Sequence, residues 1–159
     1  MSVLGPAGPF LNQYLGWANR QSINLENHEK PRKKMLPSYM LRQLYVKGSL
    51  RNLKEGDSVK AFTFTMKNRL GTGTIKGEVG LTVDSVQIPL ESITIKTQDQ
   101  ILNASEAFVS PYKFRVGDTI EFIVNREGGL TVGQHKMLIR VNTMEFGKAE
   151  FDVVDTISQ

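Results

Sequence analysis

Cysteine is absent from this sequence of 159 residues, and histidine occurs only twice. The absence of cysteine excludes a thiolate nucleophile, a cysteine-ligated zinc ion and an iron–sulfur cluster. Two histidines are too few for a multi-histidine metal centre, so we expect no metal ligands, no cofactor site and no catalytic residues in this chain. A chain without cysteine also fits a reducing compartment, and the cytoplasm is the expected location.

Long apolar runs are also missing. The first 19 residues carry no charged side chain, but glycine and proline interrupt them five times and no basic segment precedes them. A secretory signal peptide has the opposite pattern. No other stretch approaches the ~20 apolar residues that span a bilayer. We therefore expect no signal peptide and no contact with a membrane.

The net charge of +4 lies mainly at the N-terminal end. Residues 1–38 have an excess of three basic side chains, and the rest of the chain has an excess of one. The body of the protein is thus nearly neutral and lacks the broad basic face of a nucleic-acid-binding protein, so we expect no nucleic-acid partner. The basic run at 30–34 has the charge to bind phosphates, but we interpret it as a solvated linker.

Residues 1–37 are predicted to form an N-terminal arm, because they combine glycine, proline and polar side chains. Within this arm Phe10, Tyr14 and Trp17 recur at spacings of three and four, which fits a short amphipathic turn or an extended strip. An arm has too little apolar mass for its own core, so its large aromatic side chains dock elsewhere. We expect these three to form a partner interface, with docking onto the chain's own domain as the alternative.

Residues 38–159 are expected to form a single antiparallel β domain. Apolar and polar side chains alternate, as in half-buried strands. The clearest segments are 62–66, 79–83, 93–95, 120–124, 137–141 and 149–153. With 41–50 counted as a further strand there are at least seven, separated by short turns, and no helical window follows residue 40. This pattern predicts an all-β fold, an antiparallel β-sandwich or barrel of the jelly-roll type with an extended arm.

Two local features differ from regular strands. Val59 and Ala61 are out of phase with the apolar side chains that follow them, which predicts a β-bulge near Ala61. Gly71–Thr74 has the glycines of a phosphate-binding loop but neither its lysine nor the helix that should follow. We interpret this segment as a hairpin loop.

His135 is the candidate for a contact with substrate or ligand. The sequence has no nucleophile elbow and no zinc-binding helix motif, and His28 lies in the arm, where we assign it no catalytic role. His135 shares its phase with Met137 and Ile139, which places it at the rim of the inner face. An imidazole there is able to accept a proton or contact a ligand. Because no carboxylate or second histidine is nearby in sequence, we favour a structural role in which it bonds a loop carbonyl.

Four short fragments occur in a fixed order along the β domain: LYVKGSLRN at 44–52, LTVD at 81–84, GDTI at 117–120 and GGLTVGQH at 128–135. In this order they resemble the small β subunit of bacterial C-glycoside deglycosidases, over roughly residues 39–153. The most specific of them is Gly-Gly-Leu-x-x-Gly-x-His between two strands. Asp84-Ser85 stands where the pattern has an Asp-Gly hairpin turn, and the arm lies outside the similarity.

The resemblance implies a two-subunit lyase whose large α subunit is a TIM barrel that carries a divalent metal, typically manganese, and the acid and base residues. The substrate class it implies is a 3-oxo-C-glucoside of a flavonoid or isoflavonoid. The oxo group acidifies the neighbouring sugar proton, and removal of that proton leads to loss of the aglycone, which is protonated as it leaves. The present chain would then be a non-catalytic accessory subunit. The alternative is a stand-alone carbohydrate- or protein-binding β-sandwich without an enzymatic role.

Overall fold

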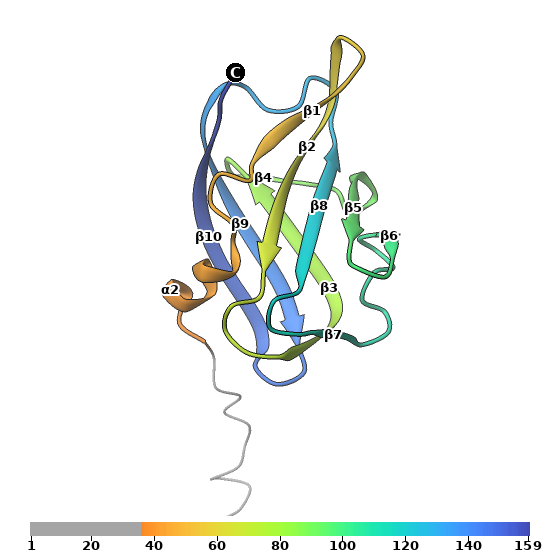
Figure 1. Ribbon diagram of the computed structural model, residues 1–159, viewed down its shortest axis with the longest axis vertical. Helices are drawn as coiled ribbons and strands as arrows, with labels where there is room; N and C mark the ends of the chain where they lie inside the picture. Colours follow the sequence, from red (N-terminus) through yellow and green to blue (C-terminus); the bar gives the residue numbers. More distant parts are fainter. Residues whose placement is uncertain (1–35) are drawn as a thin grey trace, which may run out of the picture. The chain divides into compact units, whose positions relative to one another are not determined.

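The computed structural model in Figure 1 describes residues 36–159. These residues belong to one compact unit, Lys34–Gln159. Phe10, Tyr14, Trp17 and His28, and with them the predicted docking arm, lie outside the described residues.

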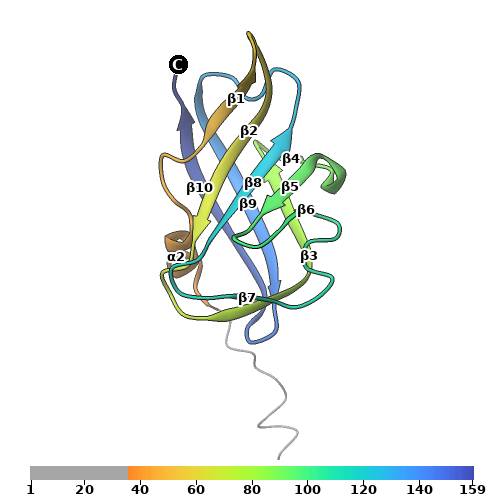
Figure 2. The ribbon, with the colours of Figure 1, turned by 45° about the vertical axis from the view of Figure 1, so that its right-hand side comes forward.

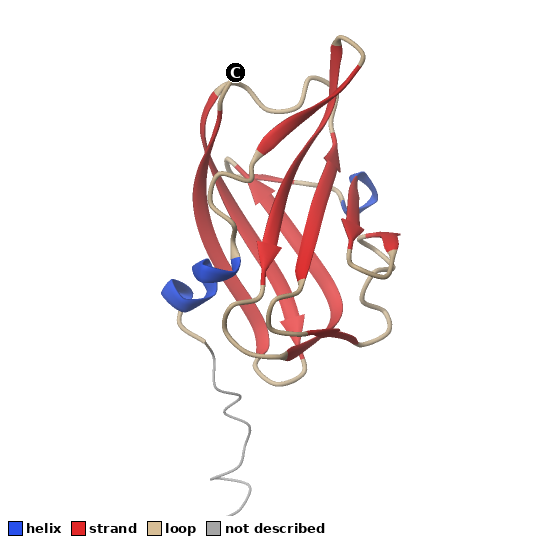
Figure 3. Cartoon of the chain, in the orientation of Figure 1, coloured by secondary structure: helices blue, strands red, loops and turns tan. Residues whose placement is uncertain are grey.

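Two antiparallel sheets make up the fold, as the strand arrows in Figure 3 show. The first sheet has the order β1 (Arg51–Glu55), β2 (Ser58–Lys67), β8 (Thr119–Asn125), β5 (Ile93–Lys96), β6 (Ile101–Asn103). The second has the order β10 (Gly147–Ile157), β9 (Gly133–Thr143), β3 (Gly73–Val83), β4 (Val86–Gln87), with β7 (Tyr112–Phe114) paired to one end of β3. In the turned view of Figure 2 the strands of the first sheet cross in front of those of the second. The predicted all-β antiparallel sandwich is confirmed.

The core lies between the sheets and is built from the alternate side chains that the sequence pattern singles out. The innermost residues include Phe62, Phe64, Leu81, Ile93, Ile95, Phe122, Val124, Met137 and Ile139, each at most 2% exposed. Phe64 from β2 and Phe122 from β8 stack with their ring centroids 4.8 Å apart. Apolar burial of this kind is the main favourable term in folding, so the alternation fixes which face of each strand points inward.

The predicted strand over 41–50 is wrong. Ser38–Leu41 forms a short α-helix, α2, and Arg42–Leu44 continues it as a 3-10 turn, η1. A second 3-10 turn, η2, precedes β5 and covers Leu90–Ser92. Of the segment 41–50, only Tyr45 joins a sheet, through an isolated bridge to Met66 of β2. The expectation of no helix after residue 40 is therefore corrected as well.

The reason lies in the spacing of the buried side chains. Leu41, Leu44 and Tyr45 are all buried, and their spacing of three and four is the period of a helix rather than of a strand. Pro37 precedes α2 in an extended conformation, and its carbonyl accepts the first hydrogen bonds of the helix from the N–H groups of Met40 and Leu41, at 3.0 Å and 3.1 Å.

The predicted bulge near Ala61 is confirmed. Leu53 pairs with Ala61 and Lys54 pairs with Val59, which leaves Lys60 as the extra residue of β2. The interpretation of Gly71–Thr74 as a hairpin loop is wrong, because β2 and β3 belong to different sheets. Gly71 and Thr72 instead lie in the connection between the two layers, and Gly73 and Thr74 begin β3.

Among residues 36–159, no helix has both the length and the apolar character that crossing a membrane requires.

Candidate functional site

His135 lies near the start of β9 and is buried, with 7% of its surface exposed. Its Nδ1 lies 2.6 Å from Oδ2 of Asp84, and its Nε2 lies 2.7 Å from the carbonyl oxygen of Thr131. A carboxylate and a carbonyl only accept hydrogen bonds, so this arrangement favours the protonated ring, in which both nitrogens donate. The predicted bond to a loop carbonyl is confirmed, and the fold adds a carboxylate from 51 residues away. We call Asp84, Thr131 and His135 the His135 clip.

The clip changes the acidity of both its charged members. Burial alone would lower the pKa of His135, but the hydrogen bonds to Asp84 and to the Thr131 carbonyl outweigh it and raise the pKa above its ordinary value. The hydrogen bond from His135 lowers the pKa of Asp84, and the bond from the backbone of Lys136 lowers it further. Each group therefore stabilises the charged form of the other.

Asp84 also fixes the turn between β3 and β4. Asp84 and Ser85 have φ values of 49° and 71°, the left-handed conformation of a two-residue type I′ hairpin turn. The second carboxylate oxygen of Asp84 accepts a hydrogen bond from the backbone N–H of Lys136 at 3.0 Å. One side chain thus ties this hairpin to β9 at two points.

The Gly128–His135 segment is held from the other sheet by Asn52 of β1. The Asn52 side chain donates to the Leu130 carbonyl at 2.8 Å and accepts from the Leu130 N–H at 2.9 Å. Gly129 has a φ of 61°, and a Cβ added there would lie 2.3 Å from Oδ1 of Asn52 and 2.6 Å from Cγ1 of Val59. The glycine is required by this close approach, and the most specific part of the motif is a rigid structural element.

The rigid segment presents apolar side chains to solvent. Val132 is 60% exposed and follows Thr131 directly, and Val86 is 58% exposed two residues after Asp84. A surface depression of about 710 Å³ includes Val132, Leu53 and Ile157 in its lining, together with the basic Arg51 and Lys54 among others. Val132 and Leu53 give this depression an apolar part, and Arg51 and Lys54 give it a basic part.

The buried carboxylate of Asp155 on β10, 6% exposed, was not predicted. Its Oδ2 accepts hydrogen bonds from the Tyr45 hydroxyl and the Gly48 N–H, both at 2.8 Å, and from the Leu50 N–H at 3.3 Å. Burial alone would raise the pKa of Asp155, but these bonds and one from the Thr156 N–H lower it. Burial and the bond to Asp155 raise the pKa of Tyr45. The phase of Asp155, the same as that of the buried residues of β10, is the sequence signal for this inward position.

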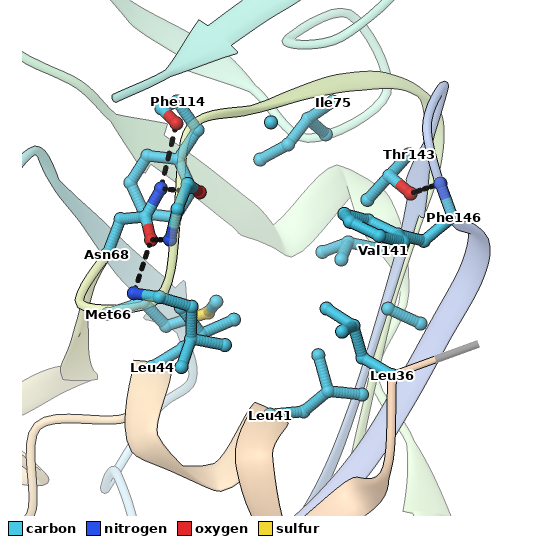
Figure 4. Close-up of a pocket in the computed structure, with 14 residues that line it drawn as sticks. Leu36, Leu41, Leu44, Met66, Asn68, Ile75, Phe114, Val141, Thr143 and Phe146 are labelled. Atoms are coloured by element: carbon cyan, nitrogen blue, oxygen red, sulfur yellow. Dashed lines mark hydrogen bonds between the residues drawn. The ribbon is translucent and has the colours of Figure 1, made fainter. Parts of the chain in front are cut away.

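An apolar cavity of about 60 Å³ lies at the other end of the sandwich (Figure 4). Leu36, Leu41 and Leu44 form one side of it in this view, and Ile75 and Phe114 line the side opposite. The volume is far below the several hundred Å³ of a typical small-molecule site.

The polar groups around this cavity bond to one another. Nδ2 of Asn68 donates to the carbonyls of Phe114 and Gly71, at 2.8 Å and 2.9 Å, and its Oδ1 accepts from the Leu70 N–H at 3.0 Å. Thr143 accepts from the Phe146 N–H in the same view. These groups are satisfied within the protein, so the cavity suits an apolar group and not a sugar.

No group of three or more histidine, aspartate or glutamate side chains within residues 36–159 is placed to hold a metal ion. The one histidine in this part of the chain, His135, has both ring nitrogens within hydrogen-bond distance of Asp84 and Thr131.

Comparison with known proteins adds a family match. Residues 40–158 match the family model described as hydroxymethylglutaryl-CoA reductase, N-terminal domain. No curated protein matches the sequence. Among solved structures, the bacterial hydrophobin BslA is 14% identical, with a TM-score of 0.28, and the alignment covers 72% of this chain and 98% of that protein.

Proposed function

The chain belongs to the hydroxymethylglutaryl-CoA reductase N-terminal domain family, and from this premise we propose that it is a non-catalytic part of a larger enzyme that docks on a separate catalytic partner. The family description names one domain of an enzyme, and the four sequence fragments resemble an accessory subunit. The observation that carries the proposal is the His135 clip, which holds the most specific fragment rigid beside exposed Val132 and Val86.

The finer proposal is that the partner is the TIM-barrel α subunit of a C-glycoside deglycosidase. In that complex the α subunit supplies the divalent metal, manganese in the typical case, and the acid and base groups that cleave a 3-oxo-C-glucoside from its flavonoid or isoflavonoid aglycone. The present chain supplies a rigid surface and no reacting group. A cytoplasmic location belongs to this proposal, because a chain without cysteine fits a reducing compartment.

The arm is the second contact in this proposal. Phe10, Tyr14 and Trp17 are proposed to bind the α subunit, because aromatic side chains without a core of their own are frequent interface anchors. Removal of residues 1–36 is expected to weaken the complex and to leave the melting temperature of the β domain unchanged. Undiminished affinity of the truncated chain would exclude this role of the arm.

The family match favours a second candidate, an accessory domain of a hydroxymethylglutaryl-CoA reductase. The two candidates differ in the reaction that the complex performs. We propose to co-express the chain with the protein encoded by the neighbouring reading frame and to isolate the complex by size exclusion.

The complex and each separate protein are then assayed for cleavage of a 3-oxo-C-glucoside and for reduction of hydroxymethylglutaryl-CoA. We expect deglycosidation by the complex and none by this chain alone. Reduction of the thioester by the complex would establish the second candidate instead. Activity of the isolated chain in either assay would overturn the accessory role.

A further inference from the structure

The outer face of the second sheet carries a polar groove of about 350 Å³, and no residue of the His135 clip lines it. Its lining combines the side chains of Glu78, Arg140, Asn142, Lys148 and Glu150 with the amide of Gln87 and with apolar atoms of Val79, Ile88 and Leu90. We call it the Arg140 groove.

The backbone itself hollows this face. Between Ile75 and Val79 the register of β3 against β9 shifts, so that three residues of β3 stand opposite a single residue, Asn142. Gly77 within the bulge has a φ of 100°, and its N–H donates to the Phe108 carbonyl at 2.7 Å. Bulges of this kind bend a strand locally and re-aim its side chains, often next to a binding site.

Arg140 lies across a position that has no side chain. Its neighbour on β3 is Gly80, and a Cβ added there would lie 2.7 Å from Nε and 2.9 Å from Nη2 of Arg140. On the other side Glu150 of β10 is the cross-strand partner of Arg140. The guanidinium nevertheless lies over Gly80, and no ion pair within 4.0 Å joins it to Glu150.

The four charged side chains of the groove form no ion pair with any other described residue. Within the part of the chain that the structure describes, the ion pairs involve neither Arg140 nor Lys148, and neither Glu78 nor Glu150. Two cationic donors and two carboxylate acceptors therefore face the same depression. The Asn142 amide, which donates to the Glu78 carbonyl at 3.3 Å, supplies a further polar group.

We propose that the Arg140 groove binds a neutral carbohydrate, with one hexose unit over Gly80. A sugar hydroxyl both donates and accepts, so neighbouring hydroxyls satisfy a guanidinium and a carboxylate together. An anionic ligand would meet Glu78 and Glu150, and a cationic one would meet Arg140 and Lys148. Ile88 and Leu90 offer an apolar contact for the C–H face of the ring. Since no aromatic platform lines the groove, we expect a dissociation constant on the order of millimolar for a single hexose.

The test is an NMR titration of the isotopically labelled full chain with three sugars of similar shape. The probes are methyl β-glucopyranoside, which is neutral, glucuronate, which is anionic, and glucosamine, which is cationic. The neutral sugar is expected to shift the amides of 78–80 and 140–142 in a saturable way, and more strongly than the two charged sugars. Absence of saturable shifts in these amides, or stronger binding of a charged sugar, would overturn the proposal.

Arg140→Gln removes the central donor, and Arg115→Gln is a matched change at an exposed arginine outside the groove lining. Arg140→Gln is expected to weaken binding of the neutral sugar about tenfold or more, and Arg115→Gln to leave it unchanged. Gly80→Ala is a second variant that is expected to weaken binding of the neutral sugar, because the added Cβ displaces the Arg140 guanidinium. Equal affinities of the Arg140→Gln and Arg115→Gln chains would overturn the assignment. The titration uses this chain alone, so its outcome is independent of the proposed catalytic partner.

Discussion

At the scale of the residue, Phe122 of β8 and Thr63 of β2 lie close together but point to opposite faces of the first sheet. Substitutions at these two positions therefore separate the effect of core packing from that of a hydrogen bond. Phe122 is 2% exposed and stacks on Phe64. Thr63 is also buried, at 1%, although the alternation predicts a half-buried outer face, and its hydroxyl donates to the Phe122 carbonyl at 2.8 Å. Because Phe62, Thr63 and Phe64 are all buried, β2 is covered on both faces at this point.

We expect Phe122→Ala to lower the free energy of unfolding by about 3–5 kcal/mol, because it removes a large side chain from a closed core. Thr63→Ala is expected to cost about 1–2 kcal/mol, because it removes one hydrogen bond and one methyl group. Urea melts of both variants measure the difference. Equal losses would mean that the inward face of the strands is assigned incorrectly.

The His135 clip makes stability depend on pH in a defined direction. The pKa of His135 is raised in the folded protein, so its contribution is complete below its ordinary value of 6.5 and is lost as the pH rises through the folded pKa. The pKa of Asp84 is lowered, so its contribution is complete above 3.8 and is lost as the pH falls through the folded pKa. The clip therefore stabilises most between these two ordinary values.

We expect the wild-type chain to lose stability as the pH rises from below to well above 6.5, and His135→Gln to lose less over the same interval. Thermal melts of both chains across this interval measure the slope. Parallel curves for the two chains would show that His135 titrates alike in the folded and unfolded states.

At the scale of the element, the β3–β4 hairpin contains a strained residue. Ser85 has a φ of 71°, and a residue with a side chain pays an energetic penalty in this conformation that glycine avoids. Ser85→Gly is expected to raise the free energy of unfolding by about 1 kcal/mol, since type I′ turns favour Asp-Gly. A chemical melt tests this, and a loss of stability would contradict the turn assignment.

The strands were predictable because their burial follows a period of two, as in 79–83 and 137–141. The segment 41–50 was not, because its buried side chains are few and the helical spacing of Leu41 and Leu44 is too short to stand out. A helix of one or two turns contains too few residues for its hydrophobic periodicity to be recognised in the sequence. Interactions between distant segments escaped prediction for a different reason.

Both carboxylate networks join residues that are far apart in sequence. Asp84 meets His135 across 51 residues and Asp155 meets Tyr45 across 110. Local patterns place each of these residues on a face of a strand but do not pair them. The glycines of the 128–133 segment were visible as a motif, yet the need for Gly129 arises only from its approach to Asn52.

At the scale of the whole molecule, the sandwich has two different ends. At one end the His135 clip and the Asn52 bonds hold a rigid loop with Val132 exposed, and at the other a small apolar cavity is closed by α2. Val116 precedes β8 and Val132 follows it, so the two valines mark opposite ends of one strand, and each is 60% exposed. They form a matched pair for locating the partner surface.

The central claim is that the end with the His135 clip binds a catalytic partner. The most direct measurement is a calorimetric titration of the proposed α subunit with the wild-type, Val132→Asp and Val116→Asp chains, each checked for an unchanged melting temperature. We expect Val132→Asp to weaken binding about tenfold or more, because it places a charge in an apolar contact, and Val116→Asp to bind as the wild type does. Equal binding by all three chains, or no binding by the wild type, would contradict the claim.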